Sequence, residues 1–305
     1  MNHVNFFAGN RVASLCAALV VSGVIFFPVK DMAGNVTMND GGSSATVNLG
    51  GGTGNIGMNN WDVGGPNQLN QQWFWYSIPG VNLGVAQSID TISAATVLTA
   101  SGSDGINDLL ATYHNNQLTV QVEYMLMGNG AGSGSADLGE NLTILNSGLS
   151  EFTLKFYQYS DFNLLGGAND IVSMYGTPYN PSDPFSGYNG ALQLVNGSTG
   201  SGIAELVNAP NANNGEANTV GGVNSTLYKL NNTANLTLND NVNAGPGDVT
   251  WALEWDATLA AGQSLSISKD KGLAVMYSIV PEPTTMAFIA LGLGVLGLAR
   301  RRQSS

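Results

Sequence analysis

The chain has 305 residues, of which 43% are hydrophobic and 10% are charged, a balance too apolar and too low in charge for a disordered protein. Its 9 Lys and Arg against 21 Asp and Glu give a formal net charge of −12. That charge excludes nucleic acid as the expected partner, because such binding needs clustered cations that displace counterions. Between residues 34 and 280 the cations are Lys155, Lys229, Lys269 and Lys271.

The N-terminal segment has the order of a secretory signal. An uncharged apolar stretch of 18 residues, from Val12 to Val29, follows Arg11. The stretch exceeds the usual ~7–15 residues and approaches the ~20 of a membrane span, so a signal anchor stays open as an alternative. We expect residues 1–34 to form the signal, as a helix, with cleavage near Gly34. The single cysteine, Cys16, would leave with it, so the mature chain would have no disulfide and no thiol chemistry.

The next segment, residues 35–59, is rich in Gly, Asn and Ser. We expect it to be a loosely ordered lead-in with one short strand at 45–49. Its three consecutive glycines, 50–52, are not a phosphate loop, since no Gly-Lys-Ser/Thr sequence follows them.

Apolar and polar residues then alternate in several runs. The alternation is clear over 118–126, 152–156 and 251–256, and each run predicts a half-buried strand. Loops rich in Gly, Asn and Pro separate the runs, and helical periodicity is weak apart from a turn around 104–111. Residues 60–279 are therefore predicted to form one all-β domain, a single antiparallel β-sandwich of jelly-roll-like character.

The stretch "QQWFWYSI" gives the most suggestive binding candidate. Trp73 and Trp75 share one face of a strand, and Phe74 and Tyr76 share the other. One aromatic face is expected in the core. The other is either buried too or exposed as a platform that stacks against sugar rings, and an exopolysaccharide is then the expected partner.

Candidates for catalysis and metal binding are few. His114, before Asn115-Asn116, is expected to be exposed at a hairpin. Glu254 and Asp256 lie on one strand face, where their carboxylates could approach to about 7 Å, near the spacing of an inverting glycosidase. Two acids on a strand face more often make a soluble surface. No cofactor is expected; Ca²⁺ is the ion that the oxygen-rich segments 101–108 and 135–141 would suit best, although neither has the spacing of a calcium loop.

The C-terminal tail, residues 280–305, is unlike the body. Val280-Pro281-Glu282-Pro283 precedes an apolar run of 16 residues, Thr284 to Ala299, about 24 Å long as a helix at ~1.5 Å per residue. This is a short transmembrane helix for a ~30 Å hydrocarbon core. The cluster Arg300, Arg301 and Arg302 would stay cytoplasmic and leave the body outside. The glycines of GLGVLG match a dinucleotide fingerprint only by chance, since only eight residues follow and none is acidic.

This order of Pro-Glu-Pro, short hydrophobic helix and arginine cluster resembles the PEP-CTERM sorting signal of Gram-negative bacteria. The same segment is also known as the C-terminal domain of some ice-binding proteins, which implies nothing here about ice. The resemblance implies that an exosortase, a membrane protease, removes the tail near Pro281 to Pro283 and passes the body to the cell surface. It also implies an association with exopolysaccharide and biofilm. Segments such as "FYQYSDFNL" are similar to ectodomains of unassigned function that carry this signal.

These observations favour an exported, non-catalytic protein of the cell surface or extracellular matrix, whose partners are the exosortase and, transiently, the membrane. A carbohydrate-binding sandwich module is the alternative. A hydrolase that uses paired carboxylates is a third hypothesis.

Overall fold

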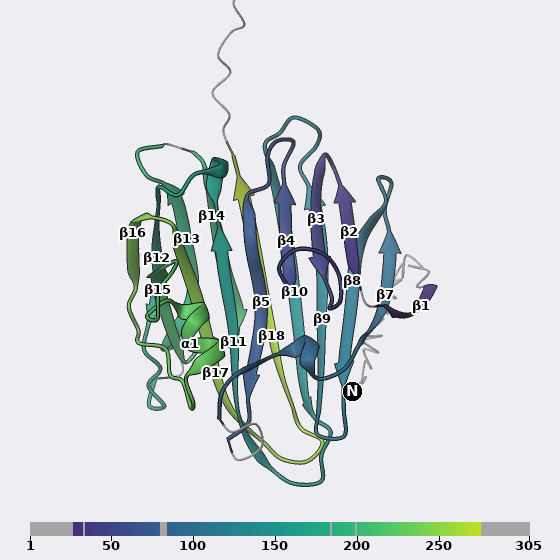
Figure 1. Cartoon of the computed structure of the whole chain (residues 1–305), viewed down its shortest axis with the longest axis vertical. Helices are drawn as coiled ribbons and strands as arrows, with labels where there is room; N and C mark the ends of the chain where they lie inside the picture. Colours follow the sequence, from purple (N-terminus) through teal and green to yellow (C-terminus); the bar gives the residue numbers. More distant parts are fainter. Residues whose placement is uncertain (1–26, 33, 80–83, 184, 199, 276–305) are drawn as a thin grey trace, which may run out of the picture.

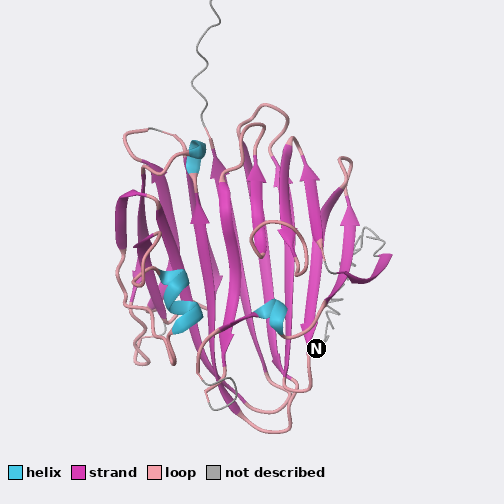
Figure 2. Cartoon of the chain, in the orientation of Figure 1, coloured by secondary structure: helices cyan, strands magenta, loops and turns pink. Residues whose placement is uncertain are grey.

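A computed structural model of the chain describes residues 27–32, 34–79, 84–183, 185–198 and 200–275. In these residues two antiparallel sheets stack face to face (Figure 1), and helix is confined to short segments (Figure 2). The predicted all-β antiparallel sandwich is confirmed. Residues 1–26 of the predicted signal helix and the whole predicted C-terminal helix lie outside the described residues. Residues 27–32, expected at the end of the signal helix, instead form strand β1 at the edge of sheet A, where they pair with β7 (Ala95–Ser101). No helix within the described ranges is long and apolar enough to cross a bilayer.

Sheet A contains ten strands. Their order is β1 (Phe27–Met32), β7 (Ala95–Ser101), β8 (Ile106–His114), β9 (Leu118–Gly128), β10 (Ser135–Asn146), β18 (Ser264–Ala274), β14 (Gly202–Ala209), β13 (Gly187–Val195), β12 (Asp170–Thr177) and β16 (Asn243–Gly247). Consecutive strands β7 to β10 pair as a meander, and β18 then joins this meander to the group formed by β12, β13 and β14.

Sheet B contains eight strands. Their order is β15 (Asn214–Thr219), β17 (Val249–Leu259), β11 (Phe152–Phe162), β5 (Leu69–Ser77), β4 (Gly57–Asp62), β3 (Ser43–Asn48) and β2 (Asn35–Asp40), and β6 (Gln87–Ser88) pairs with β5. The helical segments are α1 (Thr226–Asn232) and the 3₁₀ turns η1 (Ile89–Thr91) and η2 (Leu164–Gly166).

The three strands predicted from alternation all exist, as β9, β11 and β17. Strand β9 is half-buried, as expected, with every second residue in the core. Strands β11 and β17 differ, because both of their faces are buried along most of their length. Their second face is covered along most of its length by a chain segment described below, so Asp161 and Glu254 are buried whereas Asp256 stays exposed.

The predicted lead-in contributes β2, β3 and the start of β4 to sheet B. Its one expected strand, at 45–49, corresponds to β3, whereas β2 was not expected. Strands β2 and β3 form a hairpin whose alternating apolar residues Val36, Met38, Ala45 and Val47 are buried. The hairpin closes through two glycines, at φ values of 52° and 80°, a conformation that glycine adopts without steric cost. The weak helical turn expected around 104–111 is also absent from the structure, where a loop leads into β8.

Aromatic side chains fill much of the space between the sheets, and others, such as Trp75, pack under the segments that cover the outer face of sheet B. All five tryptophans are at most 2% exposed. Phe74 stacks on Phe156 with ring centroids 5.8 Å apart, and Phe162 stacks on Trp251 at 5.4 Å. Burial of aromatic surface on this scale stabilises the sandwich without a disulfide.

Candidate functional site

Residues 220–242, which connect β15 to β16 and include α1, cross the outer face of sheet B; we call them the cover segment. Polar contacts fasten this segment to the strands beneath it. Trp75 Nε1 donates to Asn231 Oδ1 at 3.2 Å, and the Tyr157 hydroxyl donates to the Leu236 carbonyl at 2.7 Å. The cover segment explains why the outer faces of β11 and β17 are buried.

Two buried glutamates anchor the cover segment further. Glu254 accepts from the Leu238 backbone N–H at 2.7 Å and from Lys155 Nζ at 2.6 Å. Burial raises the pKa of Glu254 to about 7, although the hydrogen bonds from Lys155 and Leu238 lower it. Glu216 pairs with Lys229 and accepts from the Thr226 hydroxyl at 2.5 Å. Both carboxylates are therefore engaged in holding the fold.

The Glu254 and Asp256 pair considered for hydrolysis is not exposed as a pair. Glu254 is fully buried, whereas the Asp256 side chain is 37% exposed. Lys155 Nζ lies 2.6 Å from a Glu254 oxygen and 3.6 Å from an Asp256 oxygen. A carboxylate closed off by the cover segment and paired with a lysine has no access to substrate, which corrects the expectation of two solvent-facing acids.

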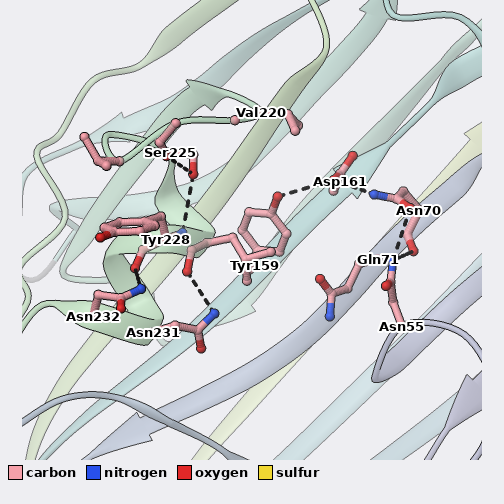
Figure 3. A pocket seen from close by; sticks show the side chains of 14 residues that line it. Asn55, Asn70, Gln71, Tyr159, Asp161, Val220, Ser225, Tyr228, Asn231 and Asn232 are labelled. Atoms are coloured by element: carbon pink, nitrogen blue, oxygen red, sulfur yellow. Dashed lines mark hydrogen bonds between the residues drawn. The ribbon is translucent and has the colours of Figure 1, made fainter.

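A groove of about 610 Å³ lies on the outer face of sheet B, between the cover segment and strands β5 and β11 (Figure 3). Asn55, Asn70, Gln71, Tyr159, Asp161, Val220, Gly221, Gly222, Val223, Ser225, Leu227, Tyr228, Asn231 and Asn232 line it. Its volume falls within the ~300–1,000 Å³ of small-ligand sites. Amide side chains make up much of its polar lining, and Asp161 carries the one carboxyl group among these lining residues.

Asp161 lies at the floor of the groove and is 3% exposed. Its Oδ2 accepts from Asn70 Nδ2 at 2.8 Å and from the Tyr159 hydroxyl at 3.3 Å. Its Oδ1 is buried and has no hydrogen-bond partner in the described part of the chain. Burial raises the pKa of Asp161 to about 6, and the nearby Asp248 adds to the effect, while hydrogen bonds from Asn70 and Tyr159 oppose it.

The amides around the groove are oriented by their own hydrogen bonds. Asn55 Nδ2 donates to the Asn70 carbonyl at 3.1 Å, Asn232 Nδ2 donates to the Tyr228 carbonyl at 2.8 Å, and Gln71 Nε2 donates to the Ile56 carbonyl at 3.0 Å. One N–H of each amide is bound to a backbone acceptor, so each side chain keeps two acceptor sites on its oxygen and at most one further N–H donor. The groove thus offers more hydrogen-bond acceptors than donors.

Helix α1 brings an exposed aromatic ring to the groove. Ser225 caps the helix by accepting from the Tyr228 N–H, and Leu230 is fully buried against the sheet. Tyr228 is 45% exposed and lines the groove. A seven-residue helix is too short for periodicity to reveal, and the cap Ser225 after a glycine pair is the signal that could have indicated it.

The four aromatic residues proposed for sugar stacking lie elsewhere. Trp73 and Phe74 are fully buried, Trp75 is 2% exposed and Tyr76 is 8% exposed. Stacking on a sugar needs an exposed ring face, and both faces of β5 are covered, one by sheet A and the other by loops and α1.

A second polar cluster lies between the sheets, with every side chain fully buried. Lys269 and Lys271 of β18 both contact Glu140 of β10 at 2.6 Å and Glu205 of β14 at 3.3 and 3.4 Å. We call these four residues the core quartet. Burial would raise the pKa of Glu205, but the two lysines and hydrogen bonds from Trp251 and Gln158 lower it to about 2. The quartet is sealed from solvent, so its role is structural. The sequence could have indicated the burial of both lysines, because Lys269 and Lys271 alternate in step with the apolar Ile267 and Leu273 and so lie on the same face of β18.

The remaining candidates from the sequence are His114 and the two oxygen-rich segments considered for Ca²⁺. His114 is exposed at the end of β8, as predicted. Segment 135–141 is part of β10 rather than a loop, and in segment 101–108 the Asp104 carboxylate accepts from the Gly41 N–H at 2.9 Å. Within the described ranges no group of three or more His, Cys, Asp or Glu is placed to hold a metal ion.

Comparison with protein families identifies the tail. Residues 280–303 match the model of the PEP-CTERM protein-sorting motif, which confirms the resemblance seen in the sequence. The match includes Val280, Pro281, Glu282 and Pro283 and the arginines 300–302, all outside the described residues. The chain therefore carries the signal of an exported, exosortase-sorted protein.

Comparison with whole proteins gives a weaker result. No curated protein matches the chain. Among solved structures, it is similar to a putative aldose 1-epimerase from Escherichia coli K12, with 11% identity, a TM-score of 0.48 and coverage of 80% of this chain and 99% of the other. A bacterial glucoamylase complexed with acarbose gives 11% identity and a TM-score of 0.49, with 85% of this chain and 34% of the other covered. Similarity at this level carries no conclusion about activity.

Proposed function

We propose that the chain is the precursor of a non-catalytic protein of the cell surface or extracellular matrix, cut by an exosortase near Val280 to Pro283. The sorting motif at residues 280–303 carries this proposal. Both prolines lack an amide donor and restrict the backbone, which keeps the cut site extended, as a protease substrate must be.

The end of the folded body supports a cut at that position. The Val275 N–H donates to the Gly134 carbonyl at 2.7 Å, so Val275 is part of the folded body. Four residues lie between Val275 and Val280, and these two positions can be at most about 17 Å apart along the chain. A cut near Val280 would leave β18 complete, and the core quartet with it. Before the cut, the body would be held close to the membrane surface.

The arrangement of the acids favours a non-catalytic body. Glycoside hydrolysis generally needs two carboxyl groups on either side of the bond that breaks. The groove is lined by one, Asp161, and the buried glutamates of the body are paired with lysines. This favours binding or a structural role over hydrolysis.

At the other end, we propose that the signal is residues 1–34, removed near Gly34. Strand β2 begins at Asn35, so such a cut would leave sheet B intact. It would also remove β1, which pairs with β7 at the edge of sheet A.

Fractionation of the native bacterium with and without its exosortase tests the sorting proposal. We expect the protein at the cell surface or in the medium when the enzyme is present, and membrane-bound precursor when it is deleted. Equal release from both strains would contradict the proposal.

A further inference from the structure

The groove has the chemistry of a hydroxyl-binding site. The amide oxygens of Asn55, Gln71 and Asn232 remain as acceptors, and one N–H of each amide is already bound to a backbone carbonyl, so acceptor sites outnumber donors on these three side chains. The buried Asp161 Oδ1 has no partner in the described residues, and this is the second, independent sign of a missing donor. A ligand that complements such a surface must supply several O–H donors.

The charges of the body exclude an acidic ligand. The lysines between residues 34 and 280 are Lys155, Lys229, Lys269 and Lys271, and each is paired with a buried glutamate. There is no arginine between residues 34 and 280. The groove also contains Asp161, with Asp248 near enough to raise its pKa. A sugar carboxylate or sulfate would therefore meet acceptors and negative charge with no cation to compensate.

An aromatic ring and the size of the groove complete the site. Tyr228, 45% exposed on α1, offers a ring face beside the amides, and an aromatic face packs well against the C–H face of a sugar ring. The cover segment that carries α1 is fastened to the sheet by buried polar contacts, so the ring and the floor are held in place together.

We propose that this groove binds a segment of a neutral polysaccharide, through stacking on Tyr228 and hydrogen bonds from sugar hydroxyls to Asp161 and the surrounding amide oxygens, and that it rejects acidic polysaccharides. This goes beyond sorting to the cell surface, and binding does not depend on removal of the tail.

Affinity electrophoresis of the full chain in mild detergent tests the proposal. The gels contain matched polymers, either hydroxyethyl cellulose or carboxymethyl cellulose, and either dextran or carboxymethyl dextran, with galactomannan as a further neutral polymer. We expect retardation by at least one neutral polymer and none by its carboxymethyl partner. Because the unprocessed chain is used, the result is independent of exosortase cleavage.

Three variants locate the binding. Tyr228→Ala should weaken retardation by about tenfold or more, as truncation of an aromatic anchor does, whereas Tyr228→Phe, which keeps the ring, should not. Tyr175→Ala is the matched control, since Tyr175 is 50% exposed on β12 in the other sheet. Thermal unfolding of each variant checks that the fold is kept. Lack of retardation by every neutral polymer, equal retardation by a carboxymethyl polymer, or equal loss in Tyr228→Ala and Tyr175→Ala would overturn the proposal.

Discussion

Removal of one acid from the core quartet should destabilise the protein severely. The quartet holds two lysines and two glutamates, all fully buried, so its charges balance. Glu140→Gln keeps the shape of the side chain but leaves two lysines facing Glu205 alone. Breaking a buried ion pair in this way costs about 3–5 kcal/mol. In a body of this size, each kcal/mol lowers Tm by about 2–4 °C, so the fall should be about 6–20 °C.

The loss of stability in Glu140→Gln cannot exceed the free energy that it costs to deprotonate one of the two lysines. Burial already lowers the pKa of Lys269, and in the variant one lysine can escape its unpaired charge by releasing a proton. Releasing a proton at pH 7 from an amine of ordinary pKa near 10.4 costs about 5 kcal/mol, and at pH 9 only about 2 kcal/mol. The destabilisation by Glu140→Gln should therefore shrink as the pH rises.

Urea unfolding of the full chain in mild detergent, followed by tryptophan fluorescence, measures the effect, since all five tryptophans are buried. The double variant Glu140→Gln/Lys271→Met restores the charge balance and should recover more than half of the loss. Glu151→Gln, at an exposed position, is the control and should change stability by less than about 0.5 kcal/mol. Two results would contradict a stabilising charge balance in the core quartet. One is a loss of unfolding free energy below about 1 kcal/mol in Glu140→Gln, and the other is a loss in the double variant equal to the sum of the losses in the two single variants.

Three further predictions concern pH, the cover segment and the tail. Burial raises the pKa of Asp161 and of Asp170 from 3.8 to about 6, so their contribution to stability is complete below pH 4 and lost as the pH rises through 6; Tm should be higher at pH 5 than at pH 8, with a smaller difference in Asp161→Asn/Asp170→Asn. Glu216→Ala removes the carboxylate that pairs with Lys229 and accepts from Thr226, so hydrogen exchange should accelerate in residues 220–242 and stay slow in β9; equal acceleration in both would argue against a separately anchored cover segment. Glu282→Ala should accumulate uncut precursor in the membrane, whereas Glu151→Ala should be processed normally; normal processing of both would argue against recognition of the Pro-Glu-Pro motif.

Much of the fold could be predicted from local patterns. Strand β9 alternates apolar and polar residues because one of its faces packs in the core and the other faces water, so the strand could be predicted from its sequence alone. Strand β3 was predicted, at 45–49, but its hairpin partner β2 was missed although Val36 and Met38 alternate with polar residues in the same way. The high content of Gly and Asn in this segment suggested loose order, but Gly41 and Gly42 form the turn while the alternating apolar side chains are buried.

The groove could not be predicted, because it depends on contacts between distant segments. Asp161 on β11 and Asn70 on β5 meet through the pairing of two strands that are far apart in sequence, and Tyr228 on α1 joins them only when the cover segment crosses sheet B. The same crossing buries Glu254, which alternation alone assigns to solvent. The aromatic run at Trp73 to Tyr76 was a clear signal of importance, but a strand covered on both sides uses its rings for packing.

The intact mass of the protein recovered from the surface or medium of the bacterium shows whether the tail is cut from the body. We expect a chain that ends near Val280 to Pro283 and retains β18, with the apolar run and Arg300 to Arg302 removed. A surface product that still carries these arginines would contradict this expectation.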